Sequence, residues 1–361
     1  MVDLREEFVH LARLPDANVS ELCRRFQISR KTGYKWLGRH SFEDQSRRPH
    51  SSPTRTAHEA KVLAVREQHP AWGARKIAHV LQRDQGVELA TSTVNSVLRR
   101  NGRIGTQASE AATPWQHFEH AKPNALWQID FKGHFATGQG RCHPLTVLDD
   151  HSRYNIVLHA LADERRTSVQ PVLQRAFEHY GLPERINADN GPPWGSAGQG
   201  DLTQLAAWLI RLGVRLSYSR PLHPQTNGKD ERFHRSFKAE VLARHELRDL
   251  QHAQKHFTQW RRVYNDERPH QALQMHTPSS RYRPSERTMP ATLAPIEYLD
   301  DDLVRRVQQG GWIHLHGREL RVGKALIGQP VACRPLADQD GLYAIFFCHH
   351  KLVEIDLNEP W

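Results

Sequence analysis

The hydrophobic pattern of this chain changes its period near Asn124, and that change limits the folds available to it. Before this point apolar residues recur at helical spacing, and after it they form short runs typical of β-strands. Helices then alternate with strands. This order predicts an α/β fold with a mixed sheet, and hairpins at one edge, over residues 123–290. The expected strands are 126–131, 143–149, 154–159, 185–189 and 214–218, and the expected helices are 167–180, 201–212, the segment after Asn227, and 249–265.

Residues 1–40 carry the pattern of a helix-turn-helix DNA-binding domain. Two amphipathic helices are followed by Ser29, the predicted cap of a third helix that bears Tyr34, Trp36 and Leu37. The basic and polar side chains of that helix suit the major groove of DNA. The alternative is a small helical bundle with a solvated basic face. The predicted DNA contacts here are Arg30, Lys31, Thr32 and Lys35.

A second helical unit follows at 57–103, between the polar linkers 41–56 and 104–122. Its last helix is predicted to be capped by Thr91 or Ser92. A second helix-turn-helix-like DNA-binding domain is therefore expected, with Arg75 and Lys76 as its contacts with DNA.

The last part of the chain, residues 300–361, reads as five short strands separated by glycine-rich turns, which predicts a small β-barrel-like domain. Residues 291–361 contain seven Lys or Arg and ten Asp or Glu. This acidic balance makes DNA binding by the C-terminal domain doubtful, so contacts in assembly or with target DNA are equally open.

The 361 residues carry a net charge of +10 and a pI of about 9.6, which favours a polyanionic partner. The four cysteines are scattered without metal-binding spacing and are expected to be reduced, mostly buried thiols. No signal sequence or membrane-spanning run is present, so a cytoplasmic protein with no membrane partner is expected.

Three carboxylates stand out in the strand-rich region. Asp130 lies inside an apolar strand, Asp189 ends a later strand before an Asn-Gly turn, and Glu231 begins a helix. Each alone has an ordinary explanation as a turn or capping residue. A carboxylate within an apolar strand is nevertheless unexpected unless it is paired or binds a metal. Because the set is all oxygen, it predicts a Mg²⁺ site.

The helix that carries Glu231 follows the sequence HPQTNG, with Asn227 as its expected N-cap. His234, Arg235 and Lys238 are spaced to share its face with Glu231. One carboxylate beside basic side chains suits a metal next to a phosphate backbone. Taken alone, an amphipathic surface helix with charge pairs explains the pattern better.

Four segments together resemble the insertion-sequence transposases with a retroviral-integrase-type DDE core. They are WQIDFKG (127–133), INADNGPP (186–193), HPQTNGKDERFHRSFK (223–238) and YNDERPHQAL (264–273). The resemblance covers about residues 15–290. It implies an RNase H-like catalytic core, and it assigns the catalytic and metal-binding acids to Asp130, Asp189 and Glu231 rather than to Glu240.

The resemblance also implies two Mg²⁺ ions, or Mn²⁺, and work as a homo-oligomer on paired DNA ends. It makes Lys238 a DNA contact, with His234 and Arg235 as weaker candidates. Asn190 and Gln225 are candidates for positioning substrate, with structural hydrogen bonding equally open. Asn265, Arg268 and His270 are expected to be architectural.

Two departures from the family are visible. More residues than usual separate Asp189 from Glu231, which the glycine-rich stretch 195–200 would explain. The His-His-Cys-Cys zinc domain of retroviral integrases is absent from the sequence.

The expected reaction begins with metal-assisted hydrolysis of a phosphodiester at a terminal inverted repeat. The freed 3′-OH then attacks target double-stranded DNA in a transesterification. Such a protein would act in the bacterial cytoplasm, at the nucleoid. One alternative is a catalytically silent helix-turn-helix regulator derived from a transposase, and another is a nuclease for RNA–DNA hybrids.

Overall fold

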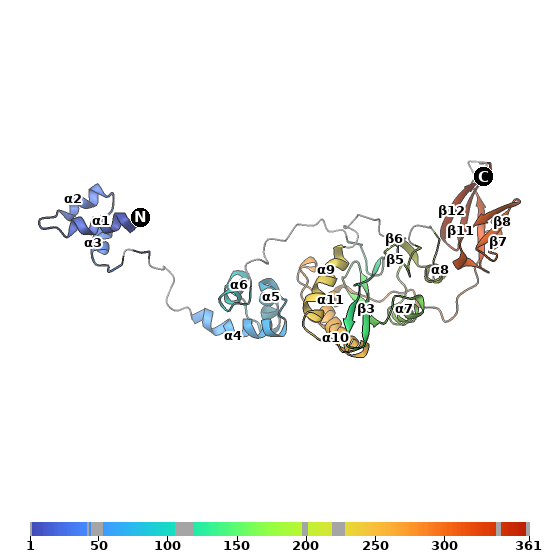
Figure 1. Ribbon diagram of the computed structural model, residues 1–361, viewed down its shortest axis with the longest axis horizontal. Helices are drawn as coiled ribbons and strands as arrows, with labels where there is room; N and C mark the ends of the chain where they lie inside the picture. The colour runs from blue at the N-terminus through green and yellow to red at the C-terminus, as the bar shows by residue number, and fades with distance from the viewer. Residues whose placement is uncertain are drawn as a thin grey trace. The chain divides into compact units, whose positions relative to one another are not determined.

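The computed structural model describes residues 2–41, 43–44, 53–104, 119–196, 201–218, 228–336 and 341–358. The chain divides into two compact units, residues 1–57 and 58–361. The first holds helices α1 (Val2–Ala12), α2 (Val19–Arg25) and α3 (Arg30–Leu37) (Figure 1).

The three helices of the first unit pack around Phe8, Val9 and Cys23. α3 approaches its neighbours closely at Gly33, where a Cβ would lie 2.6 Å from Cys23 Sγ. The expected cap of α3 is confirmed, because the backbone N–H of Thr32 donates to Ser29 Oγ at 3.1 Å. The tight α2–turn–α3 arrangement is the predicted helix-turn-helix.

A further helical domain is made of α4 (Pro53–Gln68), most of which belongs to the second unit, α5 (Ala74–Gln85) and α6 (Thr91–Arg100). α4 starts inside the segment that the sequence describes as linker, since proline is well suited to the first turn of a helix. The predicted caps of α6 are wrong. Ala90 is the capping residue, with no side-chain hydrogen bond, and the backbone is already helical at Thr91.

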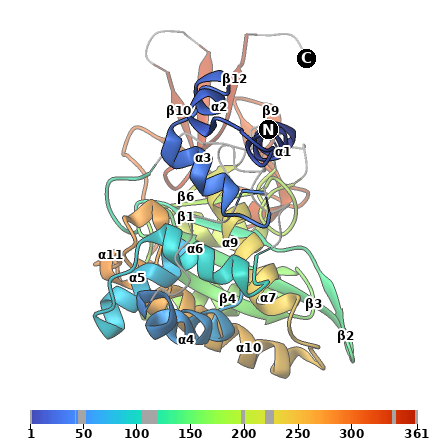
Figure 2. The ribbon, with the colours of Figure 1, turned by 90° about the vertical axis from the view of Figure 1, so that its left-hand side faces the viewer.

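The central sheet has the strand order β2-β3-β1-β5-β6, and β4 also pairs with β3. β1 pairs antiparallel with β3 and parallel with β5, so the mixed sheet is confirmed. The β2–β3 hairpin, whose first strand the sequence did not predict, extends beyond the rest of the sheet (Figure 2). The strands are β1 (Trp127–Phe131), β2 (Phe135–Thr137), β3 (Gly140–Asp149), β4 (Asn155–Leu161), β5 (Arg185–Ala188) and β6 (Arg215–Tyr218).

Helices cover both faces of this sheet (Figure 1). α7 (Arg166–Tyr180) and α8 (Gln204–Arg211) bury an apolar cluster against one face. α9 (Gly228–Phe237), the π-helix η2 (Lys238–Leu242) and α10 (Leu250–Arg262) bury a second cluster against the other. Short helical segments close this region: η3 (Val263–Glu267), η4 (Gln271–Leu273) and α11 (Pro278–Arg281).

The C-terminal domain pairs its strands in two sheets. The larger is antiparallel with the order β12-β11-β10-β7, and the smaller is the β8–β9 hairpin. Both contribute to one core with residues of α8. The sequence missed the first strand of this domain. The elements are β7 (Leu303–Arg306), β8 (Trp312–Leu315), β9 (Arg318–Arg321), η5 (Lys324–Leu326), β10 (Pro330–Pro335), β11 (Leu342–Phe347) and β12 (His350–Asp356).

The cysteines are free thiols, three of them buried, as the sequence predicts. In the portion of the chain that the structure describes, no helix combines the length and apolar character needed to cross a membrane.

Candidate active site

β1 places the side chain of Asp130 on the face of the sheet that α9 covers. Side chains alternate along a strand, and Trp127 and Ile129 belong to the apolar cluster beneath α7 and α8. Gln128 and Asp130 therefore point to the opposite face, toward α9. The carboxyl group of Asp130 is 32% exposed, so it is partly covered and still reachable from solvent.

Asp189 follows the neighbouring strand, β5. The parallel register pairs Trp127 with Ile186 and Gln128 with Asn187, and the same offset brings position 130 opposite position 189. Burial, and then the charge of Asp189, raise the pKa of Asp130 to about 6. Asp189 is exposed, and partial desolvation raises its pKa as well. The structure therefore brings these two predicted acids together.

α9 has a buried side and an exposed side. Asp230, Phe233, His234 and Phe237 are buried, and the phenylalanines anchor the helix on the sheet. The exposed side carries Glu231 and Arg235, and Lys238, the first residue of η2, continues it. The third predicted acid and two of the predicted DNA contacts thus share one solvent-facing surface, and His234 does not.

His234 was predicted to contact DNA, and the structure places it in the interior instead. Its Nε2 lies 3.0 Å from Thr146 Oγ1, and Thr146 Oγ1 donates to the carbonyl oxygen of Asp130 at 2.9 Å. Burial lowers the pKa of His234 to about 3, so its ring is neutral. The side chain is 10% exposed and lies beside β1 because it shares the inner side of α9 with Phe233 and Phe237.

Glu231 does not form a cluster with Asp130 and Asp189 in this structure. Within the described residues, no three His, Cys, Asp or Glu side chains form a ready metal-binding group. Glu231 lies on the exposed side of the same helix whose inner side contacts Thr146 through His234. Of the other residues in this region, Asn190 is exposed, and Gln225 and Asn227 lie outside the described residues.

Two buried acids next to this site were not predicted. Asp150 accepts hydrogen bonds from the backbone of His120 and from Gln128 Nε2, each at 2.9 Å, and also binds Lys229 Nζ. This contact ties the first turn of α9 to the end of β3. Asp230 lies near both Asp130 and Asp150, and burial raises its pKa well above its usual range.

Glu164 is a further acid at the site that the sequence analysis missed. Its charge contributes to the raised pKa values of both Asp130 and Asp189, so it lies near both. Its Oε1 lies 2.8 Å from His143 Nδ1, in the segment between β4 and α7. An acidic pair at a strand-to-helix junction, Asp163-Glu164, was the available signal.

The donor chemistry of this region fits a divalent cation. Asp130 and Asp189 are neighbouring carboxyl groups with raised pKa values, and Asp230 Oδ1 is a buried oxygen without a hydrogen-bond partner among the described residues. A bound cation would favour the ionised forms of Asp130 and Asp189 and would give the Asp230 oxygen a partner. Because the ligands are all oxygen, Mg²⁺ suits them better than a thiophilic metal.

Glu240 has a structural position, in agreement with its exclusion from the predicted catalytic set. It accepts a hydrogen bond from Trp260 Nε1 at 2.7 Å and pairs with Arg268 at 3.2 Å. Asn265 is equally architectural, because its side chain binds both backbone groups of Asn155. His270 is buried against Tyr264.

The predicted DNA contacts of the helical domains are also partly exposed and partly buried. Arg30, Lys31 and Lys35 are exposed on α3, and Thr32, half-buried, caps the helix with Ser29. Arg75 is exposed on α5. Burial and then the charge of Arg268 lower the pKa of Lys76 to about 7, with Glu240 also nearby. Lys76 therefore faces the region around η2 rather than open solvent.

Comparisons with known families match separate parts of the chain. Residues 120–224 and 212–278 match two family models, each described as an integrase core domain. Residues 302–360 match the C-terminal domain of the IS481 family of transposases, and residues 32–98 match a homeodomain-like domain. The predicted fold class, with helix-turn-helix domains, an RNase H-like core and a strand-rich C-terminal domain, is confirmed.

Among curated relatives, a protein of insertion element IS407 from Burkholderia multivorans is 28% identical over 237 residues. The match spans 62% of this chain and 81% of that protein. A protein of insertion element IS476 from Xanthomonas euvesicatoria is 25% identical, over 62% of this chain and 63% of its own length. The Gag-Pol polyprotein of baboon endogenous virus is 25% identical over 49% of this chain and 10% of that polyprotein.

Solved structures show more distant likeness. The simian T-cell lymphotropic virus intasome, in complex with a PP2A regulatory subunit, contains a chain that is 16% identical with a TM-score of 0.40, covering 81% of this chain and 91% of that one. The HTLV-2 integrase catalytic core domain in complex with magnesium is 16% identical with a TM-score of 0.32, covering 45% of this chain and 96% of that one.

Proposed function

We infer that this chain, which belongs to the insertion-sequence transposases with a retroviral-integrase-type core, cuts and joins DNA at the ends of a mobile element. It binds terminal inverted repeats, hydrolyses a phosphodiester at each end, and joins the freed 3′-OH to target DNA. The observation that carries the proposal is the proximity of Asp130 to Asp189 at the ends of two adjacent parallel strands, inside a matched integrase core.

Asp130, Asp189 and Glu231 would hold two Mg²⁺ ions, with Mn²⁺ as a substitute. When bound, the ions supply positive charge that promotes ionisation of water and offsets charge developing on the phosphate. The side chains hold this charge at one end of the sheet. The Thr146 and His234 hydrogen bonds fix the strand that carries Asp130, and a neutral His234 adds no competing positive charge.

The exposed side of α9 would guide DNA to these acids. Arg235 and Lys238 lie on the same surface as Glu231, so their positive charges can meet phosphates next to the scissile bond. The helix-turn-helix domains would hold the terminal repeats, and a homo-oligomer would bring two ends together. The insertion-element relatives are bacterial, which supports action at the nucleoid.

The test is strand transfer by the full chain on duplexes that carry the DNA flanking its gene. With Mg²⁺, the expected product joins the duplex 3′ end to a plasmid, and chelation of the metal should abolish it. An inert wild type that still binds the duplex would support the regulator alternative. Cleavage of RNA–DNA hybrids in preference to DNA ends would support the nuclease alternative.

Asp189→Asn separates catalysis from binding. Strand transfer should fall below detection, because a neutral amide replaces a metal-binding charge, and binding to the terminal duplex should remain. The matched control is Asp301→Asn, a change at an exposed aspartate in the segment before β7. Equal loss of activity in the control, or loss of DNA binding in Asp189→Asn, would contradict the assigned role.

A further inference from the structure

α3 presents Lys31, Tyr34 and Lys35 to solvent, and we call these three residues the α3 outer face. Lys31 is three residues from Tyr34 and four from Lys35, so their side chains are neighbours on the helix surface. Gly33 marks the opposite, packed side, because it lies against Cys23 and Phe8. The orientation of α3 in its own domain is therefore fixed by close packing.

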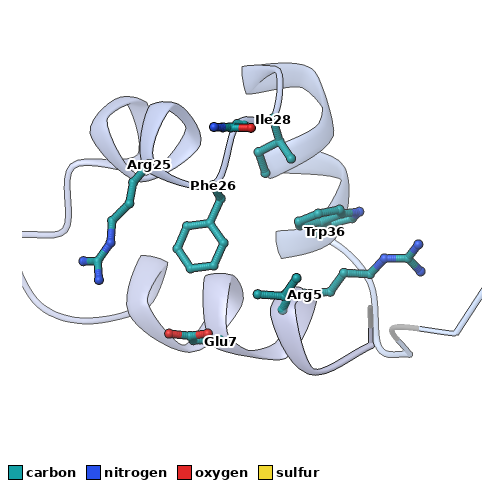
Figure 3. A pocket seen from close by; sticks show the side chains of 8 residues that line it. Arg5, Glu7, Arg25, Phe26, Ile28 and Trp36 are labelled. Carbon is teal, nitrogen blue, oxygen red and sulfur yellow. The ribbon is translucent and has the colours of Figure 1, made fainter.

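The aromatic residues of α3 have different surroundings. Trp36 packs edge-on against Phe8, with ring centroids 5.7 Å apart, and lines a groove with Phe26 and Ile28 (Figure 3). Tyr34, two residues earlier, is 61% exposed. The sequence groups both with the apolar residues of the helix, but only Trp36 contributes to the core. Packing in the core therefore does not account for the large aromatic ring of Tyr34.

The charge around this ring identifies the partner it suits. Residues 19–40 contain six Lys or Arg and a single acid, Glu21, which pairs with Arg24 at 2.8 Å. A single exposed aromatic side chain on a protein surface needs no explanation. An aromatic ring beside Lys31, which in turn neighbours Lys35, lies here on the second helix of a helix-turn-helix. Such a surface suits a polyanion and can also read apolar groups.

We propose that the α3 outer face enters the major groove of double-stranded DNA and that Tyr34 sets the base preference at the position it contacts. The proposal rests on the proposed function, in which DNA ends are the ligand. Lys31 and Lys35 contact phosphates, which holds the helix in place without reading sequence. The Tyr34 ring contacts a base edge, and the C5 methyl of thymine is the apolar group the major groove offers.

The experiment selects DNA with the full chain from a pool of duplexes whose central base pairs are randomised. Wild type should yield a consensus, and Tyr34→Ala should lose the preference at one or two adjacent positions of it. Affinity for the wild-type consensus should fall about 5- to 100-fold, as for loss of one base-pair readout. Affinity for a shuffled duplex, and the dependence on salt, should stay unchanged.

Three variants make the result specific to Tyr34. Lys31→Ala should weaken consensus and shuffled duplexes alike and lower the slope of log affinity against log salt by about one. Tyr34→Phe keeps the ring and should keep the preference. Leu14→Ala, at an apolar residue 49% exposed and outside α3, should change neither quantity. Melting curves should coincide, since the exchanged side chains are exposed.

Two outcomes would overturn the inference. One leaves the proposed function intact, and the other contradicts recognition of terminal repeats as well. If Tyr34→Ala selects the wild-type consensus with wild-type affinity, Tyr34 does not read DNA and the proposed function is untouched. If wild type selects no consensus at all, recognition of terminal repeats by this chain fails as well.

Discussion

His234 on α9 and Thr146 on β3 are joined side chain to side chain, with His234 Nε2 3.0 Å from Thr146 Oγ1. Thr146 donates its hydroxyl proton to the carbonyl of Asp130, so it accepts the Nε2 proton of His234. His234 Nδ1 is 3.9 Å from Asp130 Oδ2, which is too long for a hydrogen bond. The helix that carries Glu231 is thus connected to the backbone of Asp130 through two hydrogen bonds.

We therefore expect His234→Ala to disturb the position of Asp130 without affecting DNA binding by the helix-turn-helix domains. Strand transfer should fall about 10- to 100-fold, as when a residue that supports a metal ligand is removed. The Mg²⁺ concentration for half-maximal rate should rise. His234→Asn retains a hydrogen-bond donor and should recover part of both. An unchanged Mg²⁺ requirement in His234→Ala would count against a positioning role.

Glu231 and Glu240 should separate activity from stability, although they lie nine positions apart on one helical segment. Glu231→Gln changes an exposed side chain, so thermal unfolding should not shift, while strand transfer is lost. Glu240→Gln leaves the mostly buried Arg268 without its charge partner and should destabilise the core by about 3–5 kcal/mol. Chemical denaturation measures the change in the free energy of unfolding. Loss of stability in Glu231→Gln together with loss of strand transfer in Glu240→Gln would contradict both assignments.

Mg²⁺ should raise the melting temperature of the wild type, because a ligand of the folded state stabilises it. At ten times the dissociation constant the gain is about 1.4 kcal/mol. Asp130→Asn should abolish this shift, and Asp301→Asn should retain it. Calorimetry without DNA provides the measurement. A full shift in Asp130→Asn would place the bound metal elsewhere.

The metal-free protein should show a pH dependence that originates at Asp130. Its pKa is raised from 3.8 in the unfolded chain to about 6 in the folded protein, so the folded state binds the proton more tightly. The free energy of unfolding should therefore decrease as pH rises from about 4 to about 6. Asp130→Asn lacks this loss, and its advantage over wild type should grow across the same interval. Parallel pH profiles for the two proteins would contradict the assignment.

The sequence predicted the sheet and most of its strands because short, mostly apolar runs mark β1, β3 and β4. It missed β2 and β7, which are short and carry only partly buried and exposed side chains. Ser29 was identified as a cap because a serine before a helix has one clear use. Ala90 offers no side-chain signal, so the neighbouring Thr91 and Ser92 were preferred.

The site was predictable only to the level of motif. Asp130 and Asp189 follow from their strands, and their proximity follows from the parallel pairing of β1 with β5. Helical spacing puts His234 near Glu231 on α9. It does not determine which side of the helix packs on the sheet. Phe233 and Phe237 decide that by packing, and they turn His234 inward. Glu164 and Asp150 reach the site from separate loops. The acidic pair Asp163-Glu164 is visible in the sequence, but no local pattern shows that it meets Asp130 and Asp189.

The parallel pairing of β1 with β5 restricts how this gene can change in length. A slip of one residue in β1 would turn Asp130 to the apolar face and bring Ile129 or Phe131 to the site. Insertions or deletions within 127–131 would thus remove the chemistry even where the sheet still forms. The β2–β3 hairpin extends past this pairing, so its tip can gain or lose residues without moving Asp130. Variation in length among related elements should concentrate there.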